Sequence, residues 1–175
     1  MALEILLTEA EIQLGVERIA KAIRDDHGDE NLLLVAVLKG SLFFAADLAR
    51  KLGGEVEIDF VQVSSWGGAR SSSGIVQIRK DLDISLEDRN VILVEDIVDT
   101  GLTIMHLREL FGTRRPRSLS VASLLSKPEA RTVDAQIEYI GFEIPNEFVV
   151  GYGLDDKERY RNLPYIAVLR DGESS

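Results

Sequence analysis

Continuous apolar runs that alternate with segments of helical character constrain the fold of this chain more than any other feature. Residues 32–37 and 91–94 carry only apolar side chains, which is typical of strands buried on both faces of a sheet. Residues 41–52 lie between them and have the pattern of a helix, which two glycines at 53–54 bring to an end. Strands that alternate with helices predict an α/β fold with a mostly parallel sheet.

The rest of the chain continues this alternation. Thr8 and Glu11 have the spacing of a capping box, and apolar residues then recur at helical intervals, so we expect a helix over about 9–25. There is no internal repeat, low-complexity tract or second domain, so residues 1–175 are expected to form one domain. The other expected elements are strands at 56–63, 118–125, 137–142 and 165–169 and a helix at 103–111.

Two segments interrupt the alternation. Residues 64–74 are rich in glycine and serine and have no apolar period, which predicts a loop. This loop is either an idle linker or a functional lid, and its place between two strands favours the lid, because long loops inside compact domains are usually functional. Residues 141–155 combine Pro145 with several glycines and aromatic residues and are expected to form an irregular cap.

The composition excludes several kinds of site and partner. The chain has no cysteine, which rules out disulfides, thiolate catalysis and cysteine-ligated metals, and its two histidines argue against a histidine-rich metal site. The N-terminus is charged from Glu4 onward and is no signal peptide, and no apolar run is long enough to cross a bilayer. We therefore expect a cytoplasmic protein without a membrane partner.

The net charge constrains the ligands further. It is −10, whereas a surface built for nucleic acid needs a broad cationic face, so nucleic acid is not expected as a partner. If the ligand is a polyphosphate, its attraction to the protein must come from a few placed cationic groups and a metal ion.

The most informative segment joins the apolar strand at 91–94 to the helix expected at 103–111. In open parallel sheets, ligands bind outside the carboxyl ends of the strands. The backbone amides at the start of the helix, with the hydroxyls of Thr100 and Thr103, are suited to cradle a phosphate, and Gly101 lets the backbone come close to it.

Three acids in the same segment need another explanation, because carboxylates repel phosphate. Glu95 and Asp96 make sense if they accept hydrogen bonds from sugar hydroxyls or help to hold a metal ion. The alternative is that Asp96 and Asp99 only cap the helix, but three acids around one helix start exceed what capping needs. A phosphoribosyl group, with a phosphate beside a diol, satisfies both halves of the segment.

An apolar strand followed by two acids and then Asp-Thr-Gly-x-Thr resembles the phosphoribosyl-pyrophosphate motif of the type I phosphoribosyltransferases. The resemblance covers nearly the whole chain and is strongest to the bacterial hypoxanthine-guanine phosphoribosyltransferases. It implies a single-domain type I fold, in which helices flank a mostly parallel central sheet, with a mobile lid over about 64–74. A small C-terminal hood is implied over about 141–175, with contributions from the N-terminus. The matching segments are residues 38–41, 64–66, 124–127 and 141–155.

The resemblance implies an enzyme of purine salvage, which is a glycosyltransferase. Such an enzyme transfers the phosphoribosyl group of phosphoribosyl pyrophosphate to N9 of hypoxanthine or guanine, giving IMP or GMP and pyrophosphate, with the help of Mg²⁺. It also implies a homo-oligomer, either a dimer or a tetramer. One alternative is a phosphoribosyltransferase for xanthine or a pyrimidine. Another is a nucleic-acid-binding regulator that senses phosphoribosyl pyrophosphate, against which the acidic composition argues.

The resemblance assigns the ribose and its phosphate to the segment after the apolar strand. Asp99 takes the proton from N7 of the purine as N9 attacks C1′, a task that suits a carboxylate. Glu95 and Asp96 hold the 2′ and 3′ hydroxyls. The 5′-phosphate is expected on the backbone of Asp99, Thr100, Gly101, Leu102 and Thr103.

The resemblance assigns the pyrophosphate to residues from several segments. On their own, Lys39 would be a surface lysine at a strand end and Arg161 a surface arginine, which only the register of the match selects over Arg159. The family usually carries tyrosine where this chain has Trp66, and the family implies a cis peptide bond before Lys39. The expected pyrophosphate-binding residues are Lys39, Gly40, Ser65, Trp66 and Arg161.

The metal ion is assigned to carboxylates. Asp155 matches the magnesium ligand of the family, and Glu95 and Asp96 are further candidates. Mg²⁺ usually takes one or two carboxylates and completes its shell with water and ligand oxygens. Bound metal, Lys39 and Arg161 would then allow an acidic protein to hold a pyrophosphate anion.

The purine is assigned to Lys127 and to the hood. Lys127 donates to O6, and an ammonium group has no acceptor, so it favours a 6-oxo group and rejects the 6-amino group of adenine. Phe148, which alone would more often be a core aromatic, stacks on the base. The carbonyl of Val149 accepts from the 2-position edge, which disfavours xanthine, and Asp155 completes the purine site.

Overall fold

The computed structural model describes residues 2–65 and 76–170. Residues 66–74 of the expected lid, including Trp66, lie outside the described residues. No helix in the described part of the chain is long and apolar enough to span a membrane.

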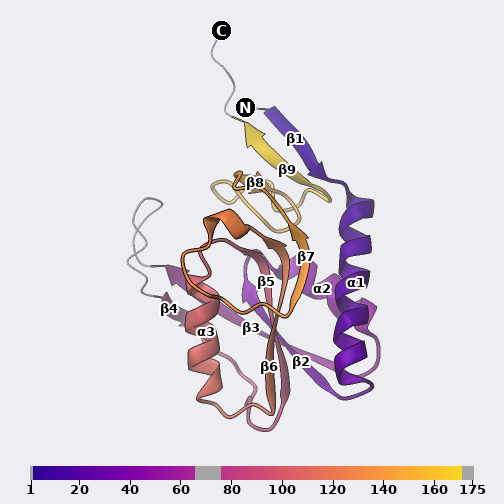
Figure 1. Ribbon diagram of the computed structural model, residues 1–175, viewed down its shortest axis with the longest axis vertical. Helices are drawn as coiled ribbons and strands as arrows, with labels where there is room; N and C mark the ends of the chain where they lie inside the picture. The colour runs from indigo at the N-terminus through magenta and orange to yellow at the C-terminus, as the bar shows by residue number, and fades with distance from the viewer. Residues whose placement is uncertain (1, 66–75, 171–175) are drawn as a thin grey trace.

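A six-stranded sheet forms the centre of the molecule, in the strand order β4-β3-β2-β5-β6-β7 (Figure 1). Neighbouring strands run parallel except for β4, which pairs antiparallel with β3. The prediction of an α/β fold with a mostly parallel central sheet is therefore confirmed. The strands are β2 (Leu32–Leu38), β3 (Val56–Ser65), β4 (Val76–Lys80), β5 (Asn90–Val98), β6 (Ser118–Ser126) and β7 (Tyr139–Glu143).

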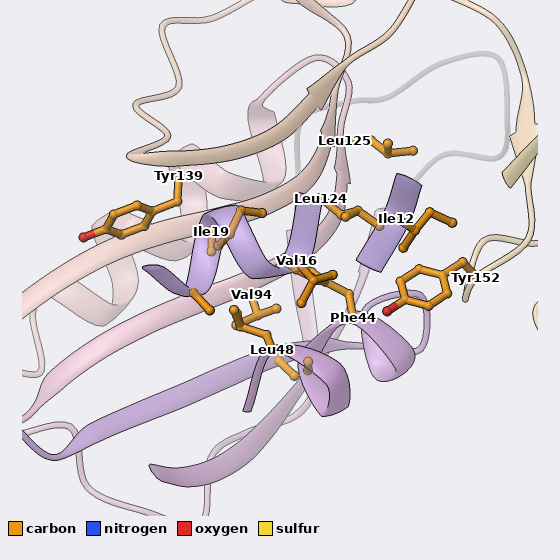
Figure 2. Packing of buried hydrophobic residues seen from close by; sticks show 14 of the residues in the cluster. Ile12, Val16, Ile19, Phe44, Leu48, Val94, Leu124, Leu125, Tyr139 and Tyr152 are labelled. Carbon is orange, nitrogen blue, oxygen red and sulfur yellow. The ribbon is translucent and has the colours of Figure 1, made fainter. Parts of the chain in front are cut away.

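Helices cover both faces of this sheet because its central strands are apolar on both sides. In β5, Leu93 belongs to the apolar cluster that includes α3, whereas the next residue, Val94, belongs to the cluster formed with α1 and α2. Figure 2 shows Val16 of α1 and Phe44 of α2 in the same cluster as Val94. The helices are α1 (Glu9–His27), α2 (Leu42–Leu52) and α3 (Leu102–Gly112), with a short 3-10 helix η1 (Pro128–Ala130).

A smaller antiparallel sheet, in the order β1-β9-β8, lies beside one end of the main sheet (Figure 1). β1, the first strand of the chain, pairs with β9, the last strand, so both ends of the described chain meet in this sheet. β8 also pairs with β9, and it comes from the segment expected to form the irregular cap. The strands are β1 (Ala2–Leu7), β8 (Val149–Val150) and β9 (Ile166–Arg170).

The structure differs from the sequence-based expectations at several boundaries. β5 continues through Glu95 and Asp96 as far as Val98, so both acids lie inside the strand and not after it. β3 extends to Ser65, so the two serines that were expected to begin the lid are strand residues. The sequence pattern does not predict β1, β4 or β8, because these strands are short and β1 pairs with a strand at the far end of the chain.

Asp59 is buried in β3 and holds the turn that follows β4. Its carboxylate accepts hydrogen bonds from the amides of Phe60, Asp83 and Ile84 at 2.7, 2.8 and 2.9 Å. Burial by itself raises the pKa of this carboxyl, but the three amides and the charge of Lys80 outweigh it, so the pKa lies below its usual value. The ionised form of Asp59 therefore stabilises the fold.

We predict that Asp59→Asn lowers the free energy of unfolding at pH 7 by about 1.5–3 kcal/mol, because an amide cannot accept all three bonds as a charged acceptor does. A depressed pKa in the folded state contributes stability above the unfolded pKa, and that stability is lost as the pH falls through the folded value. The difference in the free energy of unfolding between wild type and variant should therefore shrink below about pH 4. Urea unfolding at several pH values measures this difference. The control is Asp83→Asn, because the side chain of Asp83 is 82% exposed. A gap that does not change with pH would contradict the assignment.

Candidate active site

The predicted site residues gather at the carboxyl ends of β2, β5 and β6. These strands are neighbours in the parallel part of the sheet, so the loops that follow them meet at one edge. The chain leaves β2 for β3 on one side and later builds β5, β6 and β7 on the other side, which places a topological switch point between β2 and β5. Ligands of open α/β sheets bind at such a point.

Glu95 and Asp96 form an adjacent pair of carboxyls near the end of β5. Burial, and then the charge of Asp96, raise the pKa of the Glu95 carboxyl well above its usual value. Burial also raises the pKa of Asp96, although hydrogen bonds from Glu95 and from the Ile97 amide, at 2.8 Å, act in the other direction. Such a pair gains from a cation or from hydroxyl groups that donate to it, which fits a metal ion or a diol.

Three segments of the chain meet at Gly40, and neither Gly40 nor Gly153 has room for a side chain there. A Cβ atom on Gly40 would overlap Oδ2 of Asp96, and a Cβ atom on Gly153 would overlap the carbonyl oxygen of Gly40. The loop after β2, strand β5 and the loop after β8 can therefore meet only where glycine is present. The peptide bond between Leu38 and Lys39, at the start of this contact, is cis, as the resemblance implies.

The loop between β5 and α3 is held by the segment that follows β6. Nε of Arg131 donates to the carbonyl of Asp99 at 3.1 Å, and the amide of Thr132 donates to the carbonyl of Thr100 at 3.1 Å. Nη2 of Arg131 also donates to Oγ of Ser126 at 2.8 Å. The carbonyl groups of this loop are thus satisfied by a neighbouring segment.

The amides of the same loop are available to an anion. Gly101 has a φ of 88° and precedes the first residue of α3, and the amide of Leu102 donates to Oγ1 of Thr100 at 3.3 Å. Among the described residues, the amides of Gly101 and Thr103 have no acceptor. Open amides at a helix start carry a partial positive charge, so this loop fits a phosphate group.

Lys127 extends from the end of β6 to this loop. Its side chain is buried, and its Nζ lies 3.1 Å from Oδ1 of Asp99, whose side chain is 51% exposed. The ammonium offers only donors and the carboxylate only acceptors. A ligand with an acceptor next to an N–H group on one edge would match both side chains.

Lys39 and Arg161 meet at Glu158. Nζ of Lys39 lies 2.8 Å from Oε2 of Glu158, and Nη2 of Arg161 lies 3.1 Å from Oε1. Arg161 also pairs with Oδ1 of Asp155 at 3.0 Å and donates to the carbonyl of Gly153 at 2.7 Å. The two cations expected to bind pyrophosphate therefore lie together, each in contact with an acid.

The remaining predicted residues lie at the borders of this arrangement. Ser65 ends β3 opposite Val76, and Trp66 lies outside the described residues. Phe148 is 54% exposed, so it is not the core aromatic that its residue type alone favours. Val149 lies in β8.

A metal ion at this site would be held by few protein oxygens. Within the described ranges, no three His, Cys, Asp or Glu side chains are grouped so that they could hold a metal ion. Glu95 and Asp96 form the buried pair that gains from a cation, and both carboxylate oxygens of Asp155 are engaged, by Arg161 and by the amide of Glu158 at 2.7 Å. Oxygen ligands in small number suit Mg²⁺.

The sequence pattern does not reveal two residues of this arrangement, Arg131 and Glu158. The partners of Arg131 are backbone carbonyls and one serine, which leave no periodic signal. Glu158 lies in a run of charged residues that has the composition of a solvated surface. Its spacing of three residues from both Asp155 and Arg161 was the only signal available.

A phosphate at the start of α3 and a diol on the carboxyls of β5 would be two parts of one sugar phosphate, so the site has the character of a phosphoribosyl-binding α/β protein. Comparison with known proteins agrees with this class. The family model of the phosphoribosyl transferase domain matches residues 3–157, and the chain belongs to this family.

Relatives share this architecture closely. Hypoxanthine-guanine phosphoribosyltransferase of Bacillus subtilis is 47% identical over 167 residues, which cover 95% of this chain and 93% of that protein. The enzyme of the same name from Mycobacterium avium is 48% identical over 94% of this chain and 84% of its own length. A crystal structure of a hypoxanthine-guanine phosphoribosyltransferase from Bacillus anthracis superposes with a TM-score of 0.91 at 46% identity, covering 95% of this chain and 98% of that one.

We predict that Arg131→Ala raises the KM for phosphoribosyl pyrophosphate about tenfold, because hydrogen bonds from a charged donor typically contribute about 1.5–3 kcal/mol. Lysine cannot replace the planar fork, so Arg131→Lys should restore only part of the loss. Steady-state kinetics with each substrate varied in turn measures both effects, and thermal unfolding reports on the fold. Equal increases in the KM for the purine and for the phosphoribosyl donor would mean that Arg131 supports only the fold.

Proposed function

We propose that this chain is an enzyme of purine salvage that transfers the phosphoribosyl group of phosphoribosyl pyrophosphate to N9 of hypoxanthine or guanine. The observation that carries the proposal is the distance of 3.1 Å between Nζ of Lys127 and Oδ1 of Asp99. The family of the chain and the names of its relatives support the same activity.

The edge of a 6-oxopurine complements these two side chains. O6 and N7 lie on the same edge of the base. Lys127 donates to O6, and Asp99 accepts the proton that N7 carries. Adenine presents an amino group at position 6, to which an ammonium group cannot donate a hydrogen bond, so adenine is disfavoured.

The ribose and its phosphate lie along β5 and the start of α3. Glu95 and Asp96 accept hydrogen bonds from the 2′ and 3′ hydroxyls. N9 of the purine attacks C1′, the bond from C1′ to the pyrophosphate oxygen breaks with its electron pair on that oxygen, and the N7 proton passes to Asp99. The 5′-phosphate is bound by the backbone of Asp99, Thr100, Gly101, Leu102 and Thr103, with the open amides of Gly101 and Thr103 among the donors.

The leaving pyrophosphate lies where the loops after β2 and β8 meet. Its protein ligands are Lys39, Gly40 and Arg161, together with Ser65 at the end of β3 and Trp66 of the expected lid. Asp155, Glu95 and Asp96 are the oxygen ligands expected for Mg²⁺, and Asp155 would have to exchange a present contact for the metal ion. When bound, the ion would neutralise part of the charge on the leaving group.

The hood completes the base site. The exposed ring of Phe148 is free to stack on the purine. The carbonyl of Val149 accepts from the 2-position edge, which disfavours the 2-oxo group of xanthine, and Asp155 borders the same site. We also propose a cytoplasmic location and a homo-oligomeric assembly, the latter as the family resemblance implies.

The direct test is turnover with a panel of bases, namely hypoxanthine, guanine, xanthine, adenine and uracil, each with phosphoribosyl pyrophosphate and Mg²⁺. We expect activity with hypoxanthine or guanine, little or none with the other bases, and loss of activity in excess chelator. Turnover of xanthine or uracil in preference to hypoxanthine and guanine would favour the alternative activities. Activity with none of the five bases would contradict the proposal.

The role of Lys127 predicts a selective loss of base binding. Lys127→Ala should raise the KM for hypoxanthine by at least about tenfold, because a buried donor that reads a substrate acceptor is removed. The KM for phosphoribosyl pyrophosphate should change far less. Kinetics with each substrate varied at saturation of the other separates the two, and equal losses would remove Lys127 from the role of O6 donor.

The role of Asp99 predicts a loss of turnover with little loss of affinity. Asparagine has nearly the same shape but is a far weaker base, so Asp99→Asn should lower kcat by about 10²-fold, at the low end for acid–base catalysis because the side chain is half exposed. In Glu95→Gln, by contrast, part of the loss should appear in the KM for phosphoribosyl pyrophosphate, since bonds to the hydroxyls exist in the ground state. Single-turnover measurements that show wild-type rates in Asp99→Asn would exclude Asp99 as the base.

A further inference from the structure

One carboxylate joins the two cations that the proposed function assigns to pyrophosphate. The two oxygens of Glu158 are divided between them, Oε2 with Nζ of Lys39 at 2.8 Å and Oε1 with Nη2 of Arg161 at 3.1 Å. Both cations are therefore in contact with one anion that spans the gap between the loop after β2 and the loop after β8.

The position of Glu158 is fixed by its backbone and not by burial. Its amide donates to Oδ2 of Asp155 at 2.7 Å, and its φ is 65°, a left-handed value that is uncommon for a residue with a side chain. The side chain itself is 64% exposed. A carboxylate held in this way reaches the cations easily and can turn away from them into water at little cost.

We propose that Glu158 occupies, in the ligand-free enzyme, the place of an anionic group of pyrophosphate, and that it lowers the affinity of this site by competing with the ligand. The inference rests on the proposed function, because it takes Lys39 and Arg161 as the pyrophosphate ligands. Carboxylate and phosphate oxygens bind the same ammonium and guanidinium donors. Pyrophosphate therefore binds only when Glu158 releases both cations.

This competition acts on substrate and product alike. Phosphoribosyl pyrophosphate must displace Glu158 to enter, and the carboxylate can return to the cations as pyrophosphate leaves. Removal of its charge should tighten the binding of both compounds and slow the release of pyrophosphate. A residue that only positions the two cations would have the opposite effect, because its loss would leave Lys39 and Arg161 less well placed.

The decisive variant is Glu158→Gln, which keeps the shape and removes the charge. We expect it to bind inorganic pyrophosphate, in the presence of Mg²⁺, about three- to tenfold more tightly than wild type, since two ion pairs of one exposed carboxylate compete with the ligand in wild type. Calorimetric titration with pyrophosphate measures this, and the KM for phosphoribosyl pyrophosphate should fall by a similar factor. The KM for hypoxanthine should stay within about twofold, because this residue does not contact the base.

Asp156→Asn is the matched control. It removes one negative charge from the same loop. In the described part of the chain its carboxylate pairs with Arg159, at 3.5 Å, and with neither proposed pyrophosphate ligand. A tightening of similar size in Asp156→Asn would mean that net charge, and not displacement, governs affinity, and would overturn the inference. So would unchanged or weaker pyrophosphate binding in Glu158→Gln.

The experiment also separates this inference from the proposed function. If wild type turns over hypoxanthine or guanine and the Glu158 variant shows no tightening, only the inference fails. If wild type is inactive with all bases, the proposed function fails first. Glu158→Ala is the second variant should Glu158→Gln not fold, and it should tighten pyrophosphate binding in the same direction.

Discussion

The close approach of three backbone segments at Gly40 is the constraint on which the site depends. A Cβ atom on Gly40 would overlap the Asp96 carboxylate, and one on Gly153 would overlap the carbonyl of Gly40, so only glycine lets the loops after β2 and β8 lie this close to β5. Lys39 is adjacent to Gly40 and so is carried to this place. Arg161 is tied to Gly153 by a hydrogen bond in each direction, so that it arrives from the other side. Groups from distant parts of the chain thus converge because two glycines leave room for the Asp96 carboxylate and for the carbonyl of Gly40.

An acidic chain with a net charge of −10 can bind a polyanion only if its cations are placed and its local charge is balanced. The site meets this condition with pairs: Lys127 with Asp99, and Lys39 with Glu158. Each pair keeps a cation in position without a ligand and holds the local field near neutral. Affinity then depends on which anion the cation contacts, and the buried carboxyls of β5 gain from a metal ion or from hydroxyl groups in the same way.

The features that could be predicted from the sequence are those formed by residues close to one another in the chain. The capping box of Thr8 and Glu11 forms as expected, since both partners lie within one turn of helix. The pairing of β1 with β9 was not predictable, because it depends on a partner at the other end of the chain. In the site, the motif around Asp99 was clear, whereas Arg131 acts on backbone carbonyls that any residue presents and therefore leaves no pattern.

Arg131 and Glu158, which the sequence pattern does not reveal, act at opposite ends of the proposed ligand, phosphoribosyl pyrophosphate. Arg131 donates to a carbonyl of the loop before α3, which preorganises the amides proposed to bind the 5′-phosphate. Glu158 instead contacts both cations proposed to bind the other anion. The proposed reaction explains the difference: the 5′-phosphate stays attached to the ribose in donor and product, whereas pyrophosphate must leave. A preorganised loop suits the 5′-phosphate, which stays on the ribose. A site with its own competing carboxylate suits pyrophosphate, which must be released.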